Sequence, residues 1–226
     1  SFGFPIQFAI TGTPEYFRAN PADSTLKYSL NAINIGKQVT ETLKRIPTGK
    51  YYISFLENHD TDRFATIVQK DKAKLRCGAV LNILLPGIPS IYYGQELGVP
   101  GHIDNWGYDV NHIPVREAFP WTPDPDDSGT AVFYKDTGPW WDQSYFKTGE
   151  SEELALSTQQ KDSTSLWNLY HNLISFRKTN AATRNGDFKL IATGETDLLA
   201  FSRETSDEKV VVMLNLCEKD IKTTSP

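Results

Sequence analysis

A short polar cluster follows the apolar run at residues 51–56 and carries side chains suited to binding or acid–base chemistry. It contains Asn58, His59, Asp60 and Arg63. A carboxylate beside an imidazole suits the recognition of neighbouring hydroxyl groups, because the carboxylate accepts hydrogen bonds and the ring can donate one. The alternative is a structural turn in which an aspartate caps the next helix and the histidine is merely packed. The residue types alone leave both interpretations open.

Two other groups of polar residues give weaker evidence for a functional site. Two histidines and two aspartates lie close together in the sequence, but their spacing matches no usual zinc pattern. Residues 124–127 (DPDD) lack the glycine and the terminal glutamate of an EF-hand loop. We therefore expect no metal site in this sequence. No G-x-S-x-G elbow occurs either. The histidine and aspartate residues are His102, Asp104, Asp109 and His112.

Short apolar runs alternate along the sequence with segments of helical pattern, which indicates βα units around a parallel sheet. These elements must position the polar cluster. The apolar runs predict strands at residues 4–10, 51–56 and 88–93. Helical spacing of apolar residues predicts helices over about 21–43, 70–85 and 164–178. In α/β barrels, catalytic groups lie at the carboxyl ends of the strands, and the polar cluster follows such an end.

The rest of the chain shows two further patterns. Residues 94–165 lack periodicity and are rich in aromatic side chains, and a loop of this length is usually functional. After Asn185-Gly186, apolar and polar residues alternate over 187–192, 198–203 and 210–216, which predicts an antiparallel β domain.

Composition narrows the class of protein. The 226 residues are 39% hydrophobic, carry a net charge of −5, and contain no apolar stretch long enough to span a bilayer. This excludes intrinsic disorder, and the acidic balance disfavours a nucleic-acid binder. The two cysteines, Cys77 and Cys217, cannot form a disulfide framework, so we interpret both as small buried hydrophobes. With Ser1 first and Met213 the single methionine, we expect a processed form or a fragment.

Two motifs resemble those of the α-amylase family, glycoside hydrolase family 13. Residues 55–60 (FLENHD) are similar to its F-x-x-N-H-D motif, and residues 87–98 (GIPSIYYGQELG) are similar to its G-x-P-x-x-Y-Y-G-x-E-x-G segment at the eighth barrel strand. The resemblance implies an α/β fold, the C-terminal portion of a TIM (β/α)8 barrel followed by an antiparallel β domain. Residues 1–182 would hold barrel strands six to eight, the long loop 94–165 and the last helix, and residues 183–226 would begin the β domain.

The resemblance also implies roles for individual residues. Asp60 resembles the third carboxylate of the family triad, which binds the 2- and 3-hydroxyls of the sugar and stabilises an oxocarbenium-like transition state. His59 and Asn58 would bind the same sugar. Residues 113–121 (IPVREAFPW) are more loosely similar to an R-x-P-x-x-W segment, which would place Arg116 at that subsite. Ala118 stands where the family usually has proline, so a purely structural arginine is equally compatible.

The family chemistry needs more than this sequence holds. Retaining glycoside hydrolysis requires a nucleophile and an acid/base about 5 Å apart. Neither the family's G-x-R-x-D motif nor its glutamate is present, and the nearby carboxylates of Glu57, Asp62 and Glu96 match neither role. We therefore expect an α-glucosidic hydrolase fragment that is inactive alone. The alternatives are a transglycosylase of the same family and a non-catalytic binding relative.

The resemblance further implies an α-glucan or malto-oligosaccharide substrate and a missing N-terminal part of the same enzyme as a partner. It implies neither nucleic acid nor membrane as partners and no cofactor in this segment, with calcium left open for the missing part. Export of starch-acting members favours an extracellular or periplasmic location, which the sequence itself does not specify. Sugar rings stack on aromatic faces, so we expect one or two tryptophans to line outer subsites, from the set Trp106, Trp121, Trp140 and Trp141.

Overall fold

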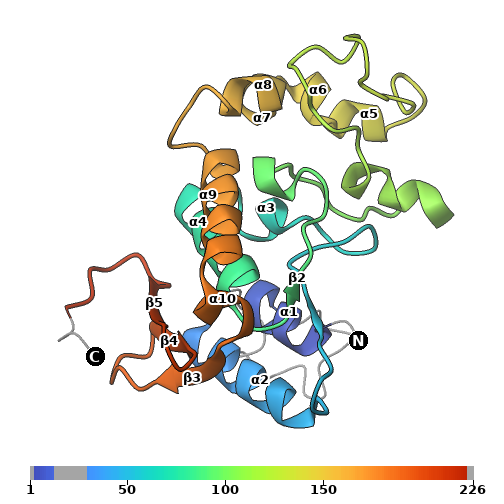
Figure 1. The fold of residues 1–226 in the computed structure, drawn as a ribbon. Coiled ribbons are helices and arrows are strands. Elements are labelled where there is room, and N and C mark those ends of the chain that lie inside the picture. Colours follow the sequence, from blue (N-terminus) through green and yellow to red (C-terminus); the bar gives the residue numbers. More distant parts are fainter. Residues whose placement is uncertain (1–2, 13–29, 223–226) are drawn as a thin grey trace. The chain divides into compact units, whose positions relative to one another are not determined.

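A computed structural model describes residues 3–12 and 30–222, which divide into two compact units (Figure 1). Unit 1 comprises the described residues up to 56 together with 77–90 and 173–222, and unit 2 comprises 57–76 and 91–172. The helices are α1 Phe4–Thr11, α2 Ala32–Arg45, α3 Phe64–Ile67, α4 Lys72–Leu84, η3 Gln95–Leu97, η4 Tyr108–Val115, α5 Trp140–Gln143, α6 Tyr145–Thr148, α7 Ser151–Leu154, α8 Leu156–Gln159, α9 Leu166–Thr179 and α10 Ala181–Asn185. The strands are β1 Ile53–Ser54, β2 Ile88–Pro89, β3 Asp187–Ile191, β4 Leu198–Glu204 and β5 Lys209–Asn215.

Strands β1 and β2 of unit 1 form a two-stranded parallel sheet. Ile53 lies opposite Ile88 in parallel register, with the helical segment of α3 and α4 between them in the sequence. The Ser90 N–H donates to the Ser54 carbonyl at 2.7 Å. The predicted β-helix-β step is therefore confirmed, although each strand is shorter than the apolar run that predicted it.

Residues 4–10 form helix α1, so the prediction of a strand there is wrong. Pro5 stands in the first turn, where its missing N–H breaks no intrahelical bond. Ile6, Ala9 and Ile10 then share one buried face at helical spacing. A short apolar run fits a buried strand or a buried helix equally well by its pattern, so periodicity could not decide between them.

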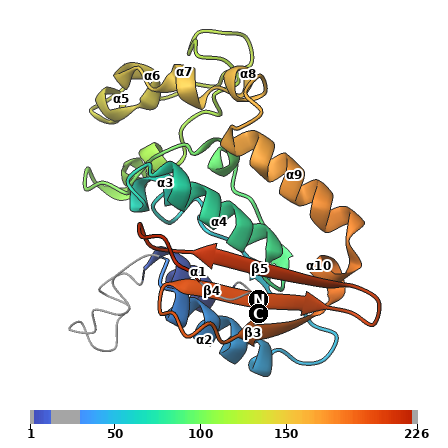
Figure 2. The same cartoon turned by 90° about the vertical axis from the view of Figure 1, so that its left-hand side faces the viewer.

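Helix α2 confirms only part of the helix that the sequence predicts over about residues 21–43. Asn31 caps it by accepting a hydrogen bond from the Asn34 N–H at 2.9 Å. Its buried face includes Ile35 and Val39, and it packs against the sheet that contains β4 (Figure 2). The predicted helix start at residues 21–24 lies outside the described residues.

The predicted antiparallel segment is confirmed. Strand β4 pairs with β3 on one side and β5 on the other, with Phe201 opposite both Leu190 and Val212 (Figure 2). Strand β4 is buried almost throughout, as the middle strand of a covered sheet should be. The predicted domain boundary at residues 182/183 remains a prediction.

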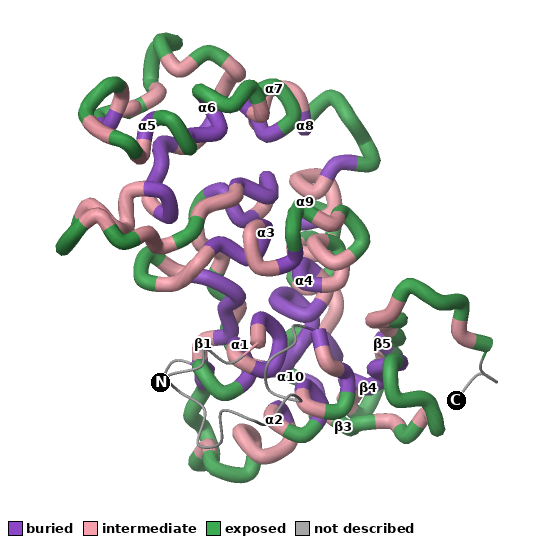
Figure 3. The backbone as a smooth tube through the Cα atoms, turned by 180° about the vertical axis from the view of Figure 1, so that it is seen from behind, coloured by how far each residue is buried: buried purple, intermediate pink, exposed green. Residues whose placement is uncertain are grey.

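Two arginines hold the carboxyl end of helix α4, whose last turns are buried (Figure 3). Arg177 donates to the carbonyls of Ile83 and Gly87, and Arg203 donates to the carbonyl of Leu84 at 3.1 Å. The last carbonyls of a helix lack intrahelical partners, and these guanidinium groups satisfy those of Ile83 and Leu84. Both arginines thereby hold the segment that leads into β2.

Unit 2 contains the aromatic-rich segment, which the sequence pattern predicted as an irregular loop. The structure instead forms six short helices there, η3, η4 and α5 to α8, none longer than eight residues. Four-residue helices are too short to show a helical repeat in the sequence. Four aromatic and four aliphatic side chains form a core cluster in this unit, made of Leu97, Val99, Ala118, Tyr134, Trp141, Tyr145, Phe146 and Leu154.

Candidate active site

The polar cluster predicted from the sequence is a loop whose base is closed by a buried ion pair. Arg63 Nη1 donates to Glu57 Oε1 at 2.8 Å, and both side chains are at most 1% exposed. The Phe64 N–H donates to the other Glu57 oxygen at 2.5 Å. Burial raises the pKa of Glu57, while Arg63 and the Phe64 N–H oppose that rise by stabilising the carboxylate.

The outer part of this loop is a tight turn that leaves the functional groups accessible. Asn58 Oδ1 accepts the Asp60 N–H at 2.8 Å, and the Asn58 N–H donates to Thr61 Oγ1 at 3.0 Å. His59 Nε2 lies 3.0 Å from Asp60 Oδ2, and about three fifths of each side chain is exposed. Asn58 therefore shapes the turn in the way that Asx residues commonly do, and its role toward a sugar remains a prediction.

Arg116 joins this turn from 56 residues further along the chain. Its Nη2 donates to Asp60 Oδ1 and its Nε donates to the His59 carbonyl, both at 3.0 Å. The structure thus brings together Asn58, His59, Asp60 and Arg116, the four site residues predicted from the sequence. A carboxylate, an imidazole and a guanidinium group converge here on an open surface, which suits a polyhydroxylated ligand.

A buried glutamate beside Arg116 was not predicted from the sequence. The Glu117 side chain accepts hydrogen bonds from Ser144 Oγ at 2.5 Å and Tyr134 Oη at 3.0 Å. Burial raises the pKa of Glu117 to about 7, against the opposing effect of both hydroxyl donors. Its partners lie 17 and 27 residues away, so no local sequence signal could have revealed this network.

The carboxylates of Asp62 and Glu96 differ in their surroundings. Asp62 Oδ1 accepts the Ile103 N–H at 2.7 Å, which ties the loop to a neighbouring segment. Glu96 Oε2 is buried without a hydrogen-bond partner among the described residues, and burial raises the pKa of this carboxyl group.

The four tryptophans proposed for outer subsites differ in accessibility. Trp141 is only 6% exposed and belongs to the core cluster, so it is unavailable for stacking on a sugar. Trp106 and Trp140 pack edge to face at 5.7 Å. Trp121 is half exposed and packs against Phe119 at 4.5 Å, so its role in an outer subsite remains a prediction.

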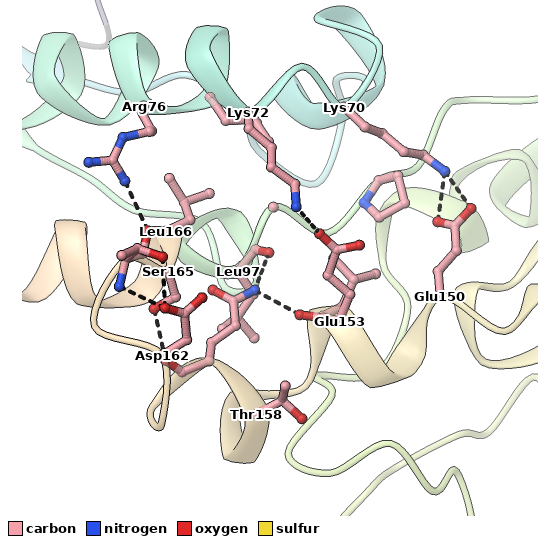
Figure 4. Close-up of a pocket in the computed structure, with 16 residues that line it drawn as sticks. Lys70, Lys72, Arg76, Leu97, Glu150, Glu153, Thr158, Asp162, Ser165 and Leu166 are labelled. Carbon is pink, nitrogen blue, oxygen red and sulfur yellow. Dashed lines mark hydrogen bonds and ion pairs between the residues drawn. The ribbon is translucent and has the colours of Figure 1, made fainter.

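A cavity of about 450 Å³ lies elsewhere in unit 2, and none of the four predicted site residues lines it. Figure 4 shows lysines on one side and glutamates on the other, joined as Lys70–Glu150 at 2.6 Å and Lys72–Glu153 at 2.7 Å. The charged groups of these pairs satisfy each other, and no aromatic side chain lines the cavity.

Two further properties concern the described residues alone. Within 3–12 and 30–222, no group of three or more His, Cys, Asp or Glu side chains is arranged to hold a metal ion. His102 Nε2 instead lies 3.3 Å from Asp104 Oδ2. Over the same residues, no helix has the length and apolar character needed to cross a membrane.

The family model for the catalytic domain of α-amylase matches residues 3–186 of this chain. The chain belongs to the α-amylase family. Alpha-amylase 3 of Dictyoglomus thermophilum is 34% identical over 163 residues, which cover 72% of this chain and 29% of the relative. A cyclomaltodextrinase of Thermoanaerobacter pseudethanolicus is 26% identical over 206 residues, covering 90% of this chain and 28% of the relative.

Solved structures agree with the assignment to the α-amylase family. The α-amylase from H. orenii superposes with a TM-score of 0.65 at 25% identity, covering 82% of this chain and 35% of that one. The trehalulose synthase MutB from Pseudomonas mesoacidophila shares the fold, with a TM-score of 0.69 at 19% identity over 89% of this chain and 41% of that one. Family membership implies the TIM-barrel fold of the α-amylase catalytic domain. The chain spans less than a third of the length of the two curated relatives named above.

Proposed function

We propose that this chain is part of a glycoside hydrolase that cleaves α-glucosidic bonds of starch-like glucans or malto-oligosaccharides with retention of configuration. The observation that carries the proposal is the Asp60 carboxylate, which Arg116 and His59 contact at 3.0 Å on an accessible loop. The relatives support the substrate class, because they include proteins named alpha-amylase and cyclomaltodextrinase.

Within this proposal, Asp60 is the third family carboxylate and accepts hydrogen bonds from neighbouring sugar hydroxyls. His59 donates to the same sugar, and Arg116 orients the carboxylate toward it. An anionic group at this position stabilises the positive charge that develops on the sugar in an oxocarbenium-like transition state. No cofactor enters this scheme.

The nucleophile and the acid/base come from outside these 226 residues in this scheme. Its support is the lack of a G-x-R-x-D motif in the sequence and the small share of each relative that the chain covers. The parallel pair β1–β2 supports placing the chain in the C-terminal part of the barrel, and the antiparallel sheet supports a following β domain. The partner of this chain is then the N-terminal part of the same enzyme.

The proposal is tested by incubating the complete enzyme with maltotetraose and following its products by proton NMR. We expect shorter oligosaccharides whose new reducing ends first appear as the α-anomer. Products longer than maltotetraose would identify the transglycosylase alternative. Binding of the oligosaccharide without any new product would overturn the proposal in favour of a non-catalytic relative.

A further inference from the structure

A closed chain of hydrogen bonds holds the Asp60–Arg116 pair, and we call it the circuit. It runs through the residues Glu57, Arg63, Tyr93, Glu117, Arg116 and Asp60. It begins at the base of the loop, where Glu57 binds both the Arg63 guanidinium group and the Phe64 N–H. These contacts hold Glu57 and Arg63, which are six positions apart, close together. Residues 58–62 therefore form a short loop that carries Asp60. Neither Glu57 nor Arg63 is accessible to a ligand, because each side chain is at most 1% exposed.

Tyr93 links the base of the loop to the segment that contains Arg116 and Glu117. Its carbonyl accepts a hydrogen bond from Arg63 Nη1 at 2.7 Å, and its hydroxyl donates to the Glu117 carbonyl at 2.9 Å. The Arg63 guanidinium carbon also lies 4.2 Å from the centroid of the Tyr92 ring, a distance typical of a cation–π contact. Tyr93 is therefore bonded both to the base of the loop and to the residue after Arg116.

Arg116 closes the circuit. Glu117 is held by its carbonyl through Tyr93 and by its carboxyl group through Ser144 and Tyr134. The backbone from which the Arg116 side chain extends is therefore fixed, and its two hydrogen bonds return to His59 and Asp60. The hydrogen bonds of Arg63 with Tyr93 and of Arg116 with His59 and Asp60 join the two segments of unit 2, 57–76 and 91–172.

We propose that Glu57, Arg63 and Tyr93 are positioning residues for the Asp60 carboxylate. Glu57 and Arg63 act by closing the loop that carries Asp60, and Tyr93 acts through Arg116. This inference rests on the proposed function, since it assigns to these residues the geometry of that site. None of the three needs to touch the substrate. Their effect on rate arises because a carboxylate misplaced by about 1 Å stabilises a transition state far less well.

The test uses Tyr93→Phe in the complete enzyme, because it removes one hydroxyl and keeps the ring. We expect kcat on maltotetraose to fall about tenfold, with KM within about twofold of wild type and an unchanged melting temperature. Tyr51→Phe is the matched control, because it removes a hydroxyl from an exposed tyrosine of unit 1 and should leave both constants unchanged.

A double-mutant cycle separates positioning from a general structural role. If Tyr93 acts through Arg116, Tyr93→Phe should lower kcat less than about twofold in an Arg116→Ala background. The same tenfold loss in both backgrounds would overturn the inference. Glu57→Gln is the second variant, which keeps an acceptor oxygen but removes the charge. Because it loosens the base of the loop that carries Asp60, it should lower kcat with KM within about twofold of wild type even if Tyr93→Phe does not fold.

Asp60→Asn in the same assay distinguishes the inference from the proposed function. Loss of activity in Asp60→Asn with wild-type activity in Tyr93→Phe and Glu57→Gln would leave the function standing and contradict the circuit. Full activity in Asp60→Asn would contradict the proposed function itself.

Discussion

Arg116 Nη2 lies 3.0 Å from Asp60 Oδ1, and Nε of the same guanidinium group donates to the His59 carbonyl. The arginine therefore donates hydrogen bonds to a side chain and to a backbone carbonyl of the same turn. Such two-point contact depends on the planar fork of the guanidinium group. It fixes the carboxylate orientation in a way that a single charge could not.

Arg116→Lys tests this two-point contact. A lysine ammonium group keeps the charge but cannot hold the two acceptors in the same fixed geometry, so we expect kcat/KM on maltotetraose to fall about tenfold. The matched control is Arg76→Lys, since Arg76 is an exposed arginine that donates to the Thr164 carbonyl. Equal activity of Arg116→Lys and wild type would show that charge alone suffices.

Glu117→Gln tests the buried carboxyl group beside Arg116. Burial raises the pKa of Glu117 from 4.5 to about 7. The folded state therefore binds this proton more tightly than the unfolded state, and the resulting stability is lost as the pH rises from about 4.5 to about 7. The loss is on the order of 3 kcal/mol for this group.

The amide of Glu117→Gln keeps an acceptor for Ser144 and Tyr134 but does not titrate. Urea unfolding at pH 5 and pH 8 should therefore show a smaller loss of unfolding free energy for the variant than for wild type. Identical pH dependence of the two proteins would mean that Glu117 is not protonated in the folded state at pH 5.

The two kinds of ion pair in unit 2 should differ sharply in their effect on stability. Glu57→Ala leaves Arg63 buried without its partner, and we expect it to lower the unfolding free energy by about 3–5 kcal/mol. Lys72→Ala breaks an exposed pair with Glu153 beside the cavity in Figure 4, and the melting temperature should not change measurably. A similar effect of both variants on urea unfolding would show that burial does not govern these pairs.

Helices α4 and α9 could be predicted closely because each extends over at least three turns, long enough for the helical repeat to appear. Strands β3 and β5 could be predicted because alternating side chains mark strands with one covered face, and β4 lies between them with nearly all of its residues buried. The error at α1 arose where a single short apolar run carried no second clue. The four-residue helices of unit 2 are held by tertiary packing, which no local pattern encodes.

For the site, the place of His59 and Asp60 after an apolar run made their loop a candidate, and the family resemblance favoured a sugar site over a structural turn. Arg116 was identified through the family resemblance alone, because it lies 56 residues from Asp60 in the sequence. Tyr93 and Glu117 could not be assigned at all. Their roles depend on a backbone carbonyl and on buried hydroxyl donors, and neither is visible in residue types or spacing.

The most direct measurement is the turnover number of Asp60→Asn in the complete enzyme acting on maltotetraose. Asparagine has nearly the same size but lacks the negative charge, so we predict at least a hundredfold loss, roughly the effect of removing one electrostatic stabiliser from a transition state. The circular dichroism spectrum should be unchanged, and Asp136→Asn, at an exposed aspartate of the same unit, should retain full activity. A turnover number for Asp60→Asn within twofold of wild type would contradict the role assigned to Asp60.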